Sequence, residues 1–122
     1  MTTTRQIPAT QNEAWGFWGT MNEDASAAWP LAMTTIADAT GEPLESVRIF
    51  LDSSYGRHFA DEVRNGLHQG QTLAEAIHTA THRWMGWKIG RQTSKQHGIP
   101  HGLPYLTGFV IHCAIVEETL AD

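Results

Sequence analysis

Between Glu75 and Glu117 the chain has 41 residues without a carboxylate, although it contains thirteen Asp and Glu residues in total. The same stretch holds four of the eight Lys and Arg residues and five of the seven histidines. Local fields rather than net charge select partners, so a chain of formal charge -5 should still present one locally positive surface. The residues expected to bind an acidic or anionic partner there are Arg83, Lys88, Arg91, Lys95, His97, His101 and Tyr105.

The segment from Arg83 to Lys95 mixes cations, tryptophans and small hydroxyl residues, which are suited to contacting phosphates and stacking on bases. Four cations are few for a nucleic-acid surface, and Trp84 is predicted to face the core. The composition therefore favours a protein partner with an acidic patch. Nucleic acid is the alternative partner, and a purely structural role is a third interpretation.

A second set of residues has metal-ligand chemistry. Glu75, His78 and His82 are spaced i, i+3 and i+7, which places a carboxylate and two imidazoles on one side of a helix. That side faces away from the predicted core, where a solvated polar face is the ordinary outcome, and the second Glu-x-x-His motif of a di-iron bundle is absent. We therefore expect a solvated face and no cofactor, with a metal site as the alternative.

Arg57, His58, Asp61 and Glu62 are crowded into one predicted helix and could serve general acid-base catalysis. The i,i+4 spacing of Arg57 and Asp61 equally predicts an ordinary surface ion pair. Catalysis also requires a cleft and a substrate contact, for which the sequence offers no sign. We expect a surface network here and a binding protein rather than an enzyme, with a small enzyme as the alternative.

The remaining candidates carry weaker signals. His97 and His101 are four residues apart, but a glycine and a proline between them interrupt helical spacing, and a zinc site would need further ligands. Cys113 is the only cysteine and lies in an apolar run, so we expect a small buried side chain. Its neighbour His112 would point in a different direction, which argues against a nucleophile and base pair. Residues 98–105 lack the spacing of a phosphate-binding loop.

Helices must position these side chains, because the apolar residues recur at intervals of three and four. Capping signals, glycines and prolines predict where each helix begins and ends. The sequence leaves open whether the two helices expected between Pro43 and Gly70 are separate or form one bent helix. The expected helices run over about 10–19, from a cap within 22–26 to Gly41, from Pro43 to about Asp52, from 52–54 to Gly66 or Gly70, from Thr72 to about Gly86, and over 106–120.

The fifth of these helices has the strongest signal, since Thr72 and Glu75 form a capping-box pattern and its apolar residues lie on one side. Glycines and prolines then predict a long loop before the last helix, with a turn of helix possible within 87–94. For residues 106–120 the Val and Ile content favours a strand, whereas the preceding Pro104 and the helical spacing favour a helix. We predict the helix.

Together these patterns predict an all-α fold: a compact single domain of five or six helices over 9–122, with one long Gly/Pro-rich loop, after a flexible tail of residues 1–8. The hydrophobic content of 41% and charged content of 17% argue against disorder. The longest apolar run is far shorter than a membrane span, so we expect a cytoplasmic protein. Five tryptophans leave room for an exposed patch and thus for a homodimer.

Three segments, Gly56–Val63, Arg83–Trp87 and Gly98–Val110, resemble uncharacterised hypothetical proteins carried on proteobacterial plasmids and integrative conjugative elements. The similarity covers most of residues 44–118. It implies a mobile-element context and an accessory or regulatory role, and it carries over no functional residues.

Overall fold

The structure, a computed structural model, describes residues 28–121 and the side chains of residues 28–116. This part of the chain is helical and contains no sheet, so the predicted all-α class is confirmed and the strand alternative for the last segment is wrong. The predicted tail of residues 1–8 and helix of about 10–19 lie outside the described residues. The helices are α2 (Ala28–Thr40), α3 (Leu44–Leu51), α4 (Ser54–His68), α5 (Leu73–Gly86), α6 (Arg91–His97) and α7 (Tyr105–Ala121).

Helices α3 and α4 are two separate elements, which answers the question that the sequence left open. Asp52 closes α3, and Ser53 adopts an extended conformation (φ -87°, ψ 177°) as the N-cap of α4. Its hydroxyl accepts a hydrogen bond from the Gly56 amide, which satisfies one of the unpaired donors at a helix start. Pro43 lies one position before α3 as its N-cap, rather than at the first helical position.

Helices α4 and α5 form a hairpin whose limits follow the predicted signals. Gly70 turns the chain with a positive φ of 95°, a conformation that favours glycine, and α4 continues through Gly66 to His68 before that turn. The predicted capping box is confirmed, because the Thr72 hydroxyl accepts from the Glu75 amide at 3.1 Å while the Glu75 carboxylate accepts from the Thr72 amide at 2.8 Å.

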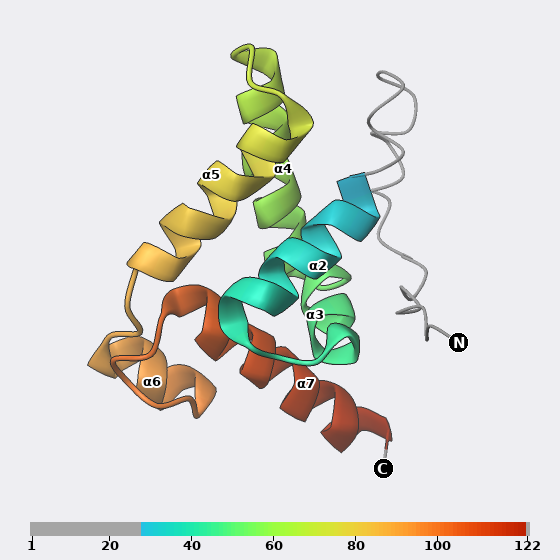
Figure 1. Cartoon of the computed structure of the whole chain (residues 1–122). Coiled ribbons are helices and arrows are strands. Elements are labelled where there is room, and N and C mark those ends of the chain that lie inside the picture. Colours follow the sequence, from blue (N-terminus) through green and yellow to red (C-terminus); the bar gives the residue numbers. More distant parts are fainter. Residues whose placement is uncertain (1–27, 122) are drawn as a thin grey trace.

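One hydrophobic core joins the helices. Figure 1 shows α7 passing beneath α2 and α3, with the α4–α5 hairpin rising from them, and α7 contacts both α3 and α5. The predicted apolar side of α5 is buried, including Ile77 and Trp84. Full burial of such a side chain contributes about 1.5–3 kcal/mol. The largest fully buried side chains are Phe50, Phe59, Phe109, Met33, Ile36, Leu51, Ile77, Ile89, Leu106, Val47 and Val63.

The segment between α5 and α7 differs from the predicted loop, because α6 occupies its middle (Figure 1). Gly90 precedes this helix and Gly98 ends it in the left-handed region, at φ 65°. Over Arg91–His97 no side chain is fully buried, so this helix has no apolar side that periodicity could detect.

Backbone hydrogen bonds close the base of this segment, which we call the excursion (residues 87–104). The amide of Ile89 donates to the Leu103 carbonyl at 2.8 Å, and the amide of Gly102 donates to the Ile89 carbonyl at 2.7 Å. Tyr105 donates in the same way to the Trp87 carbonyl at 2.7 Å. The two ends of the excursion therefore lie side by side and hold α6 next to the start of α7.

Candidate functional site

The four cations of the acid-free stretch are all exposed. Arg83 lies in the last turn of α5, Lys88 in the connection that follows, and Arg91 and Lys95 on α6 at i,i+4 spacing, which places them on one face. The ion pairs within the described residues are made by Arg48 and Arg64 instead. The four charges are therefore available to a partner.

An exposed tryptophan lies among these cations. Trp87 is 46% exposed, and its ring centroid is 6.1 Å from that of Trp84 and 5.7 Å from that of Tyr105. The buried ring of Trp84 and the partly buried ring of Tyr105 thus pack against the indole, while much of its surface contacts solvent. Large, rigid aromatic side chains of this kind are enriched at binding hot spots.

The closed base of the excursion brings one predicted histidine to the same region. Lys88 forms an isolated antiparallel bridge with Pro104, and the turn that contains His101 folds back to this bridge. His101 is exposed. We define the basic surface as Arg83, Lys88, Arg91, Lys95 and His101 around Trp87.

The other two predicted site residues, His97 and Tyr105, are only partly exposed and form part of the support. The His97 ring lies 5.2 Å from Phe109 and 5.2 Å from His112 between centroids, and its Nδ1 pairs with the Thr93 carbonyl at 3.2 Å. Tyr105 packs 4.6 Å from Phe109, and burial raises the pKa of its phenol. These rings attach α6 and the start of α7 to the core.

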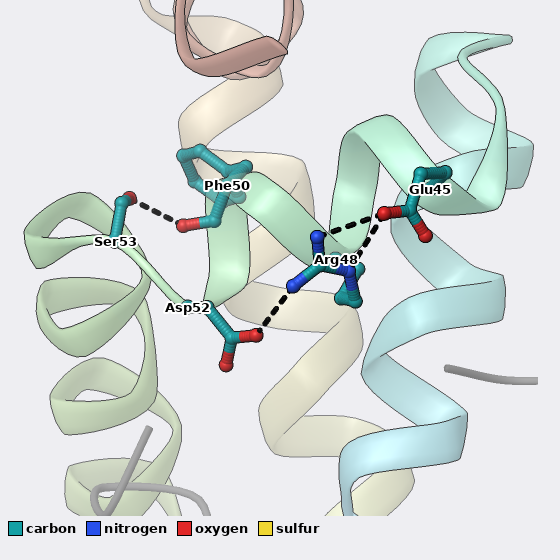
Figure 2. A network of polar contacts seen from close by, with 5 residues as sticks. All are labelled: Glu45, Arg48, Phe50, Asp52 and Ser53. Atoms are coloured by element: carbon teal, nitrogen blue, oxygen red, sulfur yellow. Dashed lines mark hydrogen bonds and ion pairs between the residues drawn. The ribbon is translucent and has the colours of Figure 1, made fainter. Parts of the chain in front are cut away.

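A groove between α3 and α7 was not predicted as a site. It has a volume of about 230 Å³, and its lining includes Tyr55, His112 and Cys113. Two of the lining residues, Arg48 and Asp52, belong to the polar network in Figure 2, where Arg48 donates to Glu45 at 2.8 and 2.9 Å and to Asp52 at 3.2 Å. The hydrogen bonds to Glu45 raise the pKa of the guanidinium, with burial opposing them. Two carboxylates thus neutralise this cation, so the groove presents no free positive charge from Arg48.

Cys113 and His112, which follow one another in α7, contact different residues. The Cys113 thiol is buried and lies 3.7 Å from the Ser53 hydroxyl, to which it donates. Burial raises the pKa of this thiol, and the hydrogen bond to Ser53 opposes that effect only in part. Since the thiolate is the nucleophilic form, a raised pKa disfavours reactivity at neutral pH. His112 instead packs 6.2 Å from Tyr55 between ring centroids.

In the predicted acid-base group on α4, Asp61 and Glu62 hydrogen-bond to other side chains. Asp61 accepts from Arg64 at 2.8 Å instead of pairing with Arg57, so the predicted i,i+4 pair is replaced by an i,i+3 pair. Glu62 accepts from the Trp84 indole nitrogen at 2.9 Å. Arg57 and His58 are exposed on the helix surface.

The metal candidates on α5 are also exposed. The carboxylate of Glu75 serves the capping box, and the hydrogen bonds with Thr72 lower its pKa. The rings of His78 and His82 lie nearly parallel, 6.2 Å apart between centroids. Among the described residues no group of three His, Cys, Asp or Glu side chains could hold a metal ion, so Glu75, His78 and His82 form no ready-made site.

A polar cleft between α4 and α5, with a volume of about 340 Å³, was likewise missed. It combines the Glu62 carboxylate and the Arg83 guanidinium with side chains from both helices. Because these residues come from two elements, no spacing in the sequence connects them. The lining also includes Asn65, Gln69, Gln71 and Thr79.

Comparisons with protein-family models, with curated proteins and with solved structures found no match for this chain. In the part of the chain that the structure describes, none of the helices has the length and apolar content needed to cross a bilayer.

Proposed function

We propose that this protein is a binding protein that docks an acidic patch of a protein partner through the basic surface. One observation carries the proposal: Arg83, Lys88, Arg91 and Lys95 are exposed, close together in the chain, and outside the ion pairs found among the described residues. Complementary potentials steer such encounters and select the partner. The resemblance to proteins of mobile elements supports an accessory or regulatory role.

The chemistry around the cations favours a protein over nucleic acid. Trp87 supplies an exposed aromatic anchor next to Lys88, and protein interfaces combine an aromatic core with a charged rim in the same way. The neighbouring cleft adds amide and hydroxyl groups, through Gln69 and Thr79, that can pair with peptide groups. Four cations would neutralise few phosphates.

The test is capture of the partner from the native host with the full chain, identification of that partner, and calorimetry of the purified pair. Replacing Lys88, Arg91 and Lys95 together by Ala should lower the affinity by about threefold to a hundredfold, because exposed charge pairs contribute about 0.2–1 kcal/mol each. Arg57→Ala removes an exposed cation of α4 and is the matched control. An unchanged affinity of the triple variant for every captured protein contradicts the proposal.

A nucleic-acid partner is the second candidate, favoured by the combination of Trp87 with the cations, since an exposed ring can stack on a base. Binding of single-stranded DNA should then weaken steeply with salt, with a logarithmic slope of roughly -3 for four phosphate contacts. A flat salt dependence excludes this candidate.

A further inference from the structure

His78 and His82 are four residues apart on α5, so the helix itself holds both imidazoles on one face. The same i,i+4 spacing supplies two zinc ligands in helical metal sites. Both side chains are exposed and can rotate, and their ring centroids are 6.2 Å apart. The rings stack nearly parallel, at an interplanar angle of 16°, so both must rotate about their side-chain bonds before one ion can lie about 2.0–2.1 Å from a nitrogen of each.

The two histidines also line a cleft between α2 and α5, with a volume of about 400 Å³. Asp38 of α2 lines the same cleft. Among the described residues of that lining, Asp38 is the only acid and none is Lys or Arg. The cleft therefore brings one carboxylate of α2 and two imidazoles of α5 to the same opening.

From this arrangement we propose that His78 and His82 chelate one divalent transition-metal ion of the imidazole-preferring class, such as Ni²⁺ or Zn²⁺. Water completes the coordination shell, because no third His, Cys, Asp or Glu joins the pair in a ready-made site among the described residues. Glu75 takes no part, since it serves the capping box.

The experiment is calorimetric titration of the full chain with NiCl₂, and separately with ZnCl₂, at pH 7.5 in a chelator-free buffer. We expect one equivalent to bind and the thermal midpoint to rise, because a ligand of the folded state stabilises it.

His78→Ala and His82→Ala should each lower the affinity by at least roughly tenfold, as losing even an outer partner typically costs about 10–100-fold. His58→Ala and His68→Ala, two exposed histidines of α4, are the matched controls and should bind normally. Far-UV circular dichroism checks that each variant is folded.

The proposal is overturned if neither metal binds, if the double variant of His78 and His82 still binds one equivalent with unchanged affinity, or if a control variant removes binding. The triple variant of Lys88, Arg91 and Lys95 should bind metal normally. The proposal of a metal site and the proposal of a partner surface are therefore tested by different variants, and either one can be contradicted without the other.

Discussion

At Gly56 the backbones of α3 and α4 approach so closely that the side chain has to be absent. An ideal Cβ at this position would lie 2.1 Å from the carbonyl oxygen of Leu51 and 2.4 Å from its Cα. Both are backbone atoms of Leu51, the last residue of α3 before the turn to α4, so a rotamer change cannot relieve the clash. The same turn carries Ser53, which bonds Gly56 and Cys113. The absent side chain at Gly56 therefore permits the close approach of α4 to the end of α3.

We predict that Gly56→Ala destabilises the protein by about 1–3 kcal/mol or more, because overpacking forces a backbone shift. Urea denaturation followed by circular dichroism measures the change. Gly86→Ala is the matched control, since nothing lies within 4 Å of an added Cβ at this helical position, and it should be neutral or stabilising by up to about 1 kcal/mol. Equal stabilities of the two variants would contradict this account of the turn.

At the scale of elements, the excursion depends on two isoleucines rather than on α6 itself. Ile89 and Ile99 flank the helix and are buried, at 1% and 2% exposure. They pack over Gly108 of α7, where an added Cβ would lie 2.9 Å from Ile89 Cγ1. Together with the hydrogen bonds at its base, these contacts hold the segment that carries most of the basic surface.

Ile89→Ala should make local unfolding of the excursion easier, because an Ile→Ala change in a core lowers the free energy of unfolding by about 2–5 kcal/mol. Limited digestion with trypsin reports this, since Lys88, Arg91 and Lys95 lie in the segment, and cleavage there should accelerate by at least roughly tenfold as local opening becomes easier. Ile115→Ala, at a residue that is 53% exposed, is the control and should change stability by less than about 0.5 kcal/mol. Identical digestion of both variants would show that the excursion is held by other contacts.

At the scale of the whole molecule, aromatic rings form a continuous path through the core. Trp84 packs 5.8 Å from Phe50 and 5.3 Å from Tyr105 between centroids, and Tyr105 continues the path to Phe109 and then to Tyr55. The path links α3, α5, α7 and α4. Edge-to-face and tilted ring pairs contribute about 0.5–1.5 kcal/mol each beyond their burial. Three groups that lose protons at alkaline pH lie in or beside this path: Tyr55, Tyr105 and Cys113.

Burial raises the pKa of all three groups, so the folded protein holds these protons more tightly than the unfolded chain does. Their stabilising contribution is therefore complete below the ordinary pKa values, 9.0 for the thiol and 10.0 for the phenols, and is lost as pH rises through and above them. We predict that the urea midpoint, measured with reductant present, falls between pH 8 and about pH 10.5.

The phenol contribution is separable, because Tyr55→Phe keeps the ring and removes one ionising group. This variant should lose less stability than the parent over the same interval. A midpoint that stays constant with pH, or an equal loss of stability in parent and variant, would show that the Tyr55 phenol does not govern the alkaline transition.

The sequence alone determined the helical class, the position of most helices and the absence of acids from the stretch with the basic surface. Helical periodicity and capping are local properties, so the Thr72–Glu75 box and the buried side of α5 were predictable from adjacent residues. The outward direction of Lys88, Arg91 and Lys95 was also predictable, because isolated cations rarely bury.

Only the tertiary structure decided which distant residues meet. It put a helix into the predicted loop, because α6 is held by Ile89 and Ile99 on α7 and has no apolar side of its own. It turned His97 inward as a support, and it placed Asp38 of α2 in the cleft with His78 and His82 of α5. These contacts join residues that are far apart in the sequence, and they depend on how the helices pack against one another. Local periodicity and capping patterns carry no information about that packing.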